Sequence, residues 1–354
     1  MFVNEKMHFE KEIYISGTCI NAKTPTFVIA EAGVNHNGDI EVAKQMIDVA
    51  VEAGANAVKF QTFKTEDLIL TSIEKAPYQK KTTDVSENQY MMLKKLEVSF
   101  EHHKILQKYC QERGIIFLTT PFESTSLKEI EQLDVPAIKV AATDLTNIKF
   151  LREVAALGKP IILSAGMCYM DEVRMALESI YPINKNVILL QCTANYPIKD
   201  EEANISVIDT FKKEFDILIG YSDHSVGVGA SPYAVAKGAK VIEKHFTLDK
   251  DMSGPDHKAS VTPDELKQLI NEIRKVERYL GKDIKIPTFS EQGTRKSLQK
   301  CFVAARNIEQ GECFTEKNIV AKRTNGEGIS ALYYDQLLLK KATRSYKVND
   351  IIME

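Results

Sequence analysis

Charged and hydroxyl side chains recur where short β-branched runs of the sequence end. Period-two alternation along a strand would place Lys59 with Gln61, and likewise Glu243 with His245, on one face. Because a buried charge is costly unless it is paired or used, several lysines and carboxylates on one surface would indicate a charged ligand. The side chains at these run ends are Glu31, Lys59, Gln61, Thr119, Thr120, Lys139, Ser164, Thr193, Ser222, Asp223, His224, Glu243, Lys244 and His245.

The two lysines Lys59 and Lys139 suit two kinds of chemistry. A lysine ammonium binds phosphate as a point charge, and hydroxyl donors such as those of Thr120 and Ser164 can complete the shell. Either lysine could instead form a Schiff base with a carbonyl substrate, as class I aldolases do. The residue types therefore leave both an anion-binding site and a covalent aldolase site open.

His224 and His245 end two consecutive runs. Neighbouring strands lie about 4.8 Å apart, so both imidazoles could reach one metal ion. Two histidines with oxygen ligands and open positions suit Mn²⁺ or a similar divalent ion, such as Mg²⁺ or Co²⁺. We expect His257, which follows soon after, not to be a ligand, and we expect the pair His102–His103, which opens a helix, to be solvated.

Strand-like runs that alternate with amphipathic helical stretches must position these side chains. The runs begin near Phe27, Ala57, Ile115, Ala137, Ile161, Val187, Ile217 and Val241, and the helical stretches cover 40–52, 102–113, 125–133, 148–157, 171–179, 205–213, 226–237 and 262–280. This count predicts an α/β fold, a closed parallel (β/α)8 TIM barrel, in which ligands gather at the carboxyl ends of the strands. An open doubly wound sheet usually has fewer strands, and no Gly-x-Gly-x-x-Gly fingerprint follows any run.

The rest of the chain suggests further segments. We expect residues 1–22 to form an N-terminal hairpin that caps the barrel, residues 23–281 the catalytic barrel, residues 282–300 a polar linker and residues 301–354 a small β-rich domain. The connection 64–99 is longer than a simple loop between strand and helix. Since long insertions usually serve as lids or binding loops, we expect this one to border the ligand site.

Composition excludes several classes of protein. Apolar residues make up 44% and charged residues 27%, which is typical of a globular protein rather than a disordered one. A net charge of −3 gives no overall field for nucleic acid or an anionic membrane. No apolar run approaches the roughly 20 residues that cross a bilayer, and the N-terminus lacks the apolar core of a signal peptide. The six scattered cysteines favour reduced thiols in a cytoplasmic protein.

Several motifs of the chain resemble those of the sialic acid synthases. They are 29–38 (IAEAGVNHNG), 59–62 (KFQT), 120–122 (TPF), 163–167 (LSAGM), 220–224 (GYSDH), 243–247 (EKHFT) and 254–257 (GPDH). The tail segments 308–312 and 322–328 are similar to the antifreeze-like (SAF) domain of that family. The resemblance runs in order from Phe27 to the C-terminus, and it implies a TIM barrel followed by a small β-rich SAF domain.

The resemblance implies an enzyme that condenses phosphoenolpyruvate with an N-acetylated mannose-type sugar, an acylated amino sugar, to give a nine-carbon α-keto acid and phosphate. It implies Mn²⁺ on His224 and His245, acting as a Lewis acid on the sugar aldehyde. It also implies a domain-swapped homodimer in which Arg323 reaches over the neighbouring subunit's barrel. The other implied roles are phosphoenolpyruvate binding by Lys59, Thr120, Lys139 and Ser164, and sugar binding by Gln61, Tyr196 and Asp256.

Such a reaction needs a carboxylate near the carbon that carries the phosphate. When the enol carbon attacks the aldehyde, positive charge develops at that carbon and water captures it. A nearby carboxylate can deprotonate the water and stabilise the cation. Glu31 is the first candidate, with Glu243 and Asp144 as alternates.

Two segments depart from the family's pattern. Where the family often has Lys-Ile-Gly-Ser-Gly-Glu, residues 139–144 are KVAATD, so Ala142 replaces a phosphate-binding serine and Asp144 is a shortened carboxylate. In 192–197 (CTANYP), an asparagine that some members have one residue earlier is Ala194, and Asn195 stands beside it as a candidate for sugar binding. Both changes bear on the substrate pocket.

The insertion bears on the choice of sugar. Segments 75–79 and 87–90 look more like those of legionaminic-acid-type and spore-polysaccharide synthases than those of neuraminate synthases. This slightly favours 2,4-diacetamido-2,4,6-trideoxymannose over N-acetylmannosamine. One rival is a Schiff-base pyruvate aldolase that uses Lys139. The other is a non-catalytic carbohydrate- or ice-binding protein, which the isolated threonines of the tail disfavour.

Overall fold

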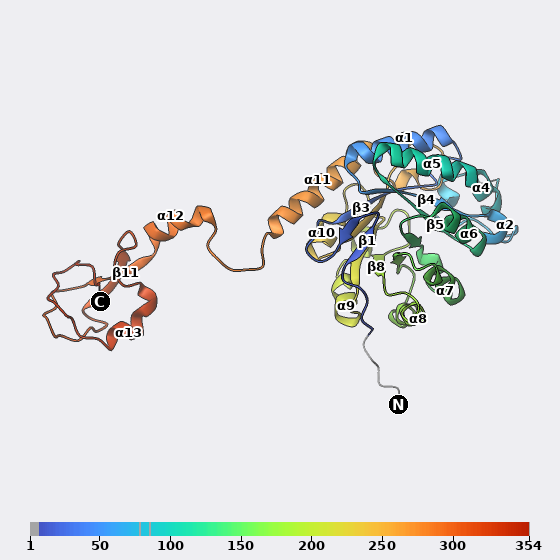
Figure 1. Cartoon of the computed structure of the whole chain (residues 1–354). Helices are drawn as coiled ribbons and strands as arrows, with labels where there is room; N and C mark the ends of the chain where they lie inside the picture. Colours follow the sequence, from blue (N-terminus) through green and yellow to red (C-terminus); the bar gives the residue numbers. More distant parts are fainter. Residues whose placement is uncertain (1–6, 78, 85, 354) are drawn as a thin grey trace, which may run out of the picture. The chain divides into compact units, whose positions relative to one another are not determined.

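The computed structural model describes residues 7–77, 79–84 and 86–353 of the chain (Figure 1). These fall into two compact units, Met1–Gly281 and Lys282–Glu354. The first unit carries the predicted barrel and the second carries a smaller core of its own.

Eight parallel strands form the sheet of the first unit. They are β3 (Phe27–Gly33), β4 (Ala57–Thr62), β5 (Ile116–Pro121), β6 (Ile138–Val140), β7 (Ile161–Ser164), β8 (Val187–Cys192), β9 (Leu218–Asp223) and β10 (Val241–His245). Their hydrogen-bonded order is β5-β4-β3-β10-β9-β8-β7-β6, and the two end strands, β5 and β6, also lie next to each other. The sheet is therefore a nearly closed (β/α)8 barrel, which confirms the predicted fold and excludes the open doubly wound sheet.

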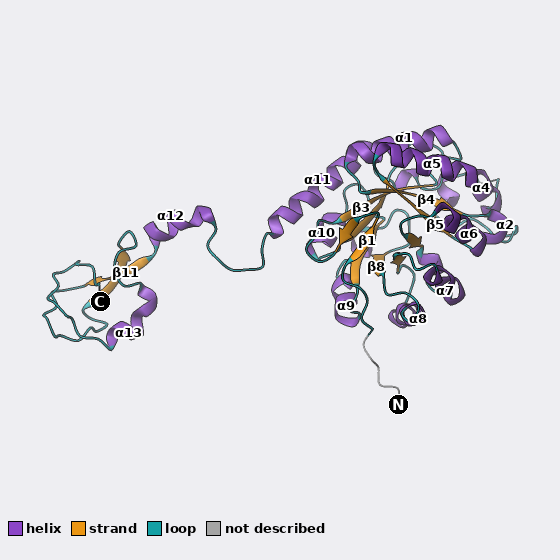
Figure 2. Cartoon of the chain, in the orientation of Figure 1, coloured by secondary structure: helices purple, strands orange, loops and turns teal. Residues whose placement is uncertain are grey.

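Helices surround this sheet (Figure 2). They are α1 (Ile40–Ala53), α5 (Phe100–Arg113), α6 (Ser124–Leu133), α7 (Ile148–Ala156), α8 (Met170–Ile180), α9 (Val207–Glu214), α10 (Ser231–Ala236) and α11 (Pro263–Leu280), with short 3-10 turns at Ala142–Asp144, Asp200–Glu202 and His257–Ala259. Helix α10 is shorter than the predicted 226–237, because Gly227 and Gly229 adopt positive φ angles. No helix among the described residues is long and apolar enough to cross a membrane.

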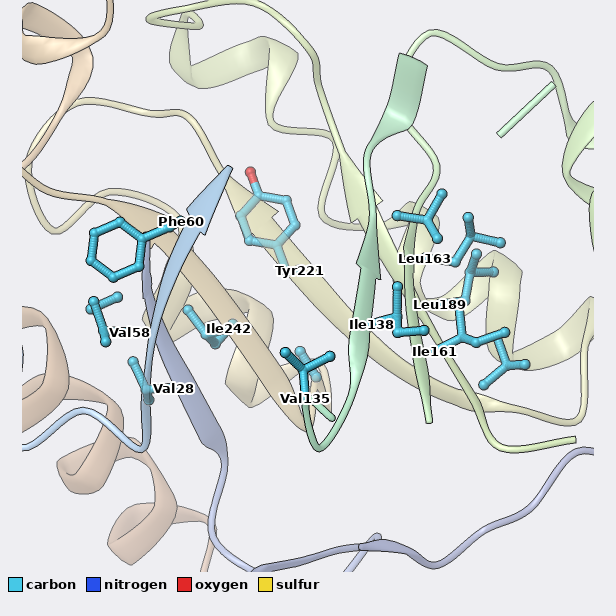
Figure 3. Packing of buried hydrophobic residues seen from close by; sticks show 14 of the residues in the cluster. Val28, Val58, Phe60, Val135, Ile138, Ile161, Leu163, Leu189, Tyr221 and Ile242 are labelled. Carbon is cyan, nitrogen blue, oxygen red and sulfur yellow. The ribbon is translucent and has the colours of Figure 1, made fainter. Parts of the chain in front are cut away.

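Alternate residues of each strand pack into two different cores. The outward side chains, among them Val28, Val58 and Ile242, pack with the helices (Figure 3). The inward side chains, among them Phe27 and Ile29, form an apolar layer inside the barrel. Further along the same inward series, toward the carboxyl ends of the strands, the side chains become charged or hydroxylated. Strand alternation thus places the polar side chains above an apolar floor.

A short hairpin completes that floor. Strands β1 (Ile13–Ile15) and β2 (Thr18–Ile20) pair antiparallel, and the turn residues Ser16 and Gly17 both have positive φ angles, as a tight hairpin turn requires. Ile13, Ile15 and Ile20 belong to the same buried cluster as the inward side chains of the barrel strands. The hairpin therefore plugs the interior of the barrel.

The long insertion after β4 is more ordered than a simple loop. It contains α2 (Thr65–Leu68), α3 (Gln79–Thr82) and α4 (Gln89–Leu96). Met92 and Leu96 pack with Val34 and Phe63 in a small apolar cluster. The insertion therefore has its own packing against the ends of β3 and β4.

The second unit contains α12 (Phe289–Leu298), β11 (Lys300–Ala304), β12 (Ile319–Arg323), a 3-10 turn at Ala331–Tyr333 and α13 (Tyr334–Leu338). Strands β11 and β12 pair antiparallel around a core that includes Phe302 and Phe314. Helix α12 lies within the segment expected to be a polar linker. Its start is marked by the capping box of Thr288 and Glu291, a local signal that the expectation of a linker overlooks.

The hairpin plug predicts that substitutions at two neighbouring residues differ in their effect on stability. Ile15 is fully buried whereas Tyr14 is 55% exposed on the other face. Replacement of Ile15 with alanine leaves a cavity in the barrel floor, so the free energy of unfolding should fall by about 2–5 kcal/mol. Urea denaturation measures this, with Tyr14→Ala as the control. Equal effects of the two variants would contradict the plug.

Candidate active site

Four charged side chains meet inside the barrel, directly above the apolar floor. The Nζ atom of Lys59 lies 2.6 Å from Glu31 Oε2 and 3.6 Å from Glu243 Oε2. The Nζ atom of Lys139 lies 3.6 Å from Glu243 Oε1. All four side chains are buried, so each charge depends on the others to offset its loss of hydration. We call Glu31, Lys59, Lys139 and Glu243 the charged cluster.

Strand register sets the geometry of this cluster. Glu31 on β3 is directly opposite Lys59 on β4, and His245 on β10 is opposite Glu31. The register shifts between Glu31 and Gly33, whose φ angle is +54°. A Cβ atom at Gly33 would lie 3.3 Å from the His245 ring, so the absence of a side chain there lets the backbone approach the imidazole closely.

Hydroxyl groups surround the charged cluster. Lys59 Nζ donates to Thr120 Oγ1 at 2.8 Å, and Ser222 Oγ donates to Glu243 Oε1 at 2.9 Å. The buried Oγ of Ser164 has no hydrogen-bond partner among the described residues. Since buried polar groups are nearly always satisfied, this hydroxyl is a natural contact for a bound ligand. Ser222 had no predicted role, although strand alternation places it on the same face as His224.

The two glutamates of the charged cluster have opposite pKa shifts. Burial raises the pKa of Glu31 to about 7, although Lys59 acts to lower it. Burial also acts to raise the pKa of Glu243, but Lys139 and Lys59 outweigh it and hold that pKa at about 2. When neighbouring carboxyl groups differ in this way, the one with the raised pKa is suited to carry a proton and the other to remain charged. Burial lowers the pKa of Lys139.

The two histidines lie beside the charged cluster. Their ring centroids are 5.5 Å apart, and the ring of Tyr196 lies 4.1 Å from that of His224. The Nδ1 atom of His224 donates to the carbonyl oxygen of Thr193 at 2.7 Å. In the neutral ring, Nε2 is therefore the nitrogen that carries no proton. The Nδ1 atom of His245 is buried without a hydrogen-bond partner among the described residues.

These histidines fit a divalent metal ion. Burial lowers the pKa of both rings, that of His224 to about 4, so the imidazoles are neutral and can act as ligands. Within the described ranges, no three His, Cys, Asp or Glu side chains lie close enough together to hold a metal by themselves. A bound ion would therefore need oxygen atoms of water or substrate as well, which is typical of catalytic sites with open positions.

The remaining predicted site residues differ in burial and in whether they contact the charged cluster. Gln61 Nε2 lies 3.4 Å from Glu31 Oε1, so it borders the charged cluster. Asp144 and Asp256 are buried, and burial raises the pKa of each to about 6. Asn195 is exposed on the loop after β8. Arg323 is exposed on β12 of the second unit, so its predicted contact with a partner's barrel stays a prediction.

Ala142 and Ala194, two of the three departures from the family's pattern, lie close together. A Cβ atom at Gly166 would be 3.1 Å from the Cβ atoms of both alanines. Gly166 follows β7 two residues after Ser164, so the two methyl groups pack against the backbone just beyond that strand. Ala142 therefore supplies no hydroxyl at the position where the resemblance implies a serine.

The prediction that His102 and His103 are solvated is wrong for His103. This ring is fully buried, with Nε2 3.0 Å from Thr62 Oγ1 and Nδ1 3.1 Å from the Ser99 carbonyl oxygen. The spacing of His103, Leu106 and Cys110 on one face of α5 could have revealed this. His257 is also buried, and its Nδ1 lies 2.7 Å from Thr247 Oγ1.

Comparisons with known proteins give evidence about the family of the chain that does not depend on the geometry of the site. A family model described as the NeuB family matches residues 46–285. The N,N′-diacetyllegionaminic acid synthase of Campylobacter jejuni is 44% identical over 332 residues, which cover 93% of this chain and 99% of that protein.

Two solved structures resemble the chain as well. The N-acetylneuraminic acid (sialic acid) synthetase of Leptospira borgpetersenii, in complex with citrate, has 35% sequence identity and a TM-score of 0.73, with coverage of 82% of this chain and 98% of that one. The spore coat polysaccharide biosynthesis protein spsE of Bacillus subtilis has 31% identity and a TM-score of 0.67, with coverage of 96% and 97%. The second match extends over both units of the chain.

The charged cluster predicts that loss of one of its carboxylates lowers the stability of the fold. Glu243→Gln would leave Lys139 and Lys59 with a single buried counter-charge, so the free energy of unfolding should fall by about 3 kcal/mol. Chemical denaturation near pH 7 measures this. Glu74→Gln is the control, because Glu74 pairs with Lys80 at the surface and its loss should have no measurable effect. Equal stabilities of the two variants would show that the cluster does not need Glu243.

Proposed function

The chain belongs to the NeuB family, and from this we propose that it condenses phosphoenolpyruvate with an N-acetylated mannose-type sugar and water. The products would be a nine-carbon α-keto sugar acid and phosphate. Support comes from the family match and from the synthase names of its relatives. The observation that carries the proposal is the buried charged cluster, with hydroxyl groups and two neutral histidines beside it at the carboxyl ends of the barrel strands.

Lys59 and Lys139 are the proposed anchors for phosphoenolpyruvate, together with the hydroxyls of Thr120 and Ser164. Both ammonium groups are within 3.6 Å of a carboxylate of the chain, so they already occupy positions where they meet anionic oxygens. The carboxylate and phosphate of phosphoenolpyruvate would compete for these groups. The free Oγ of Ser164 would supply a further donor without breaking a bond within the protein.

Glu31 is the proposed acid–base group. Its pKa of about 7 lets it take a proton from water near neutral pH, as the capture of water at the phosphate-bearing carbon requires. Once that water has added, phosphate leaves by cleavage of its bond to the same carbon. Glu243, which remains ionised, would stabilise positive charge on that carbon. Asp144, with a pKa of about 6, is the alternate proton acceptor.

His224 and His245 are the proposed ligands of a divalent cation, most suitably Mn²⁺, with Mg²⁺ or Co²⁺ as alternatives. Such an ion supplies Lewis-acid polarisation of the sugar aldehyde. The chain's own contribution is to hold His224 in one tautomer through the Thr193 carbonyl group. Gln61, Asn195, Tyr196 and Asp256 are the proposed sugar contacts, and Tyr196 already packs against the His224 ring.

For the sugar itself we propose 2,4-diacetamido-2,4,6-trideoxymannose rather than N-acetylmannosamine. The relative with 44% identity is named as an N,N′-diacetyllegionaminic acid synthase, whereas the solved sialic acid synthetase has 35% identity. The motifs of the insertion point in the same direction.

The second unit is proposed to be an antifreeze-like SAF domain that completes the partner's site in a domain-swapped homodimer. Its first segment exposes large apolar side chains, with Ile284 at 64%, Ile286 at 60% and Phe289 at 90% exposure. A run of exposed apolar residues favours contact with another surface. Arg323, exposed on β12, would meet the N-acetyl group of the sugar.

A Schiff-base pyruvate aldolase is the second candidate, because burial lowers the pKa of Lys139 and so favours its free amine. Two experiments distinguish the synthase from the aldolase. With phosphoenolpyruvate, Mn²⁺ and acylated mannose derivatives, we expect phosphate release that EDTA abolishes and added Mn²⁺ restores. Borohydride with pyruvate should leave the lysines unlabelled. A trapped lysine together with EDTA-resistant activity would instead identify the aldolase.

The proposed role of Arg323 predicts a selective kinetic effect. Arg323→Ala removes a charged donor to the sugar, so the KM for the sugar should rise by about 10-fold or more, while the KM for phosphoenolpyruvate stays within about two-fold. Lys322→Ala is the matched control, since it removes the neighbouring exposed cation of β12. Similar changes in both KM values would place Arg323 away from the sugar.

A further inference from the structure

Asp223 and Lys244 form an ion pair behind the barrel mouth. In sequence they adjoin His224 and His245, but strand alternation directs them outward, toward the layer of α10. Lys244 Nζ lies 3.3 Å from Asp223 Oδ2, and both side chains are completely buried. The pair contacts neither the charged cluster nor any residue proposed to bind substrate through a hydrogen bond among the described residues.

The carboxylate of Asp223 is fully engaged. Its Oδ1 accepts from the backbone N–H and the hydroxyl of Ser225, at 2.9 and 2.5 Å. Its Oδ2 accepts from the backbone N–H and the hydroxyl of Ser231, at 3.0 and 2.6 Å. Lys244 Nζ donates to the Ser225 carbonyl oxygen at 2.5 Å. Asp223 and Lys244 therefore tie together β9, β10, the start of α10 and the loop that follows His224.

The loop is shaped around this pair. Gly229 has a φ angle of +56°, and a Cβ atom there would lie 1.9 Å from Ser225 Oγ. Ser225 Oγ also accepts from the backbone N–H of Ala230 at 3.0 Å. Residues 225–231 thus wrap closely around Asp223, and a side chain at Gly229 would break the wrapping.

Stability alone does not account for such an arrangement. A buried ion pair seldom stabilises a fold more than apolar side chains of the same volume would, because both charges lose their hydration. What this pair fixes is geometry. Lys244 is directly opposite Asp223 in the last pairing of the β9–β10 ladder, and His224 lies one residue beyond it. The pair therefore joins β9 and β10 at the point where His224 leaves the sheet.

We propose that Asp223 and Lys244 are positioning residues that hold His224 and His245 at the separation at which both imidazoles bind one divalent cation. This inference rests on the metal site proposed above. Neither residue would touch the ion, the sugar or phosphoenolpyruvate.

The test is the affinity of the metal-free protein for Mn²⁺, measured by electron paramagnetic resonance of the free ion. The main variant is Asp223→Asn/Lys244→Met, because removal of both charges leaves neither one buried alone. Its Kd for Mn²⁺ should rise by about 10–100-fold, as is usual when groups that orient metal ligands are lost. The visible absorption of bound Co²⁺, which reports ligand geometry, should also change.

Arg274→Met is the matched control for general loss of stability. Arg274 pairs with Glu277 and donates to the Thr26 carbonyl oxygen, just before β3, at the opposite end of the barrel. The Arg274→Met variant should have a lower melting temperature, while its Kd for Mn²⁺ stays within about two-fold of the native value. Ser231→Ala, which keeps the ion pair and removes one donor to Asp223, is the milder variant and should raise the Kd by about three-fold.

The inference and its premise fail in different ways. His224→Ala should abolish tight Mn²⁺ binding, and unchanged affinity there would overturn the metal site and the positioning role together. If His224→Ala loses Mn²⁺ but the double variant and Ser231→Ala bind it normally, with an unaltered Co²⁺ spectrum, the positioning role alone is overturned. Should the double variant not fold, the Kd of Ser231→Ala decides.

Discussion

The burial of two lysines and two glutamates inside one barrel is the constraint on which the rest of this structure depends. Each of these charges would cost several kcal/mol if it were buried alone. The Lys59–Glu31 contact of 2.6 Å and the two longer contacts of Glu243 keep the group balanced. Such balance requires strands whose register is fixed to the residue, because a slip by one position would turn every side chain to the other face. The hairpin plug and the apolar floor beneath the cluster help to fix it.

Charge balance also constrains what the site can bind. The cluster is neutral as a whole when both glutamates are ionised, yet phosphoenolpyruvate would bring a carboxylate and a phosphate. Neutral histidines add no positive charge of their own. If Glu31 is to stay ionised as the proposed proton acceptor, the compensating charge would have to come from a cation, which the proposed site at the two histidines would supply. Anion binding would then depend on the residues proposed to hold the metal.

Much of this site could be predicted from the sequence, because period-two alternation is a local rule. Residue spacing along each strand is enough to direct Glu31, Lys59, Lys139 and Glu243 toward one mouth of the barrel. Spacing does not predict that Lys59 lies between two carboxylates, because that depends on distances across three strands. The burial of His103 does not follow from its place at the start of a helix, because it depends on the face of α5 that His103 shares with Leu106 and Cys110. The position of Arg323 relative to a barrel could not follow from local patterns, because Arg323 belongs to the second unit of the chain.

The residues 243–245 show how one short motif can serve two surfaces. Alternation sends Glu243 and His245 into the mouth and Lys244 out of it, where Lys244 meets Asp223 from the corresponding motif on β9. The inward residues bring a carboxylate and an imidazole to the mouth, whereas the outward pair ties the two strands to α10 and the loop. The proposed metal site needs two neutral imidazoles at a fixed separation, and the β9–β10 ladder ends at the residue before each of them. In the positioning role proposed for Asp223 and Lys244, an ion pair on the reverse side of the two strands would hold that separation without adding a charge to the substrate's surroundings.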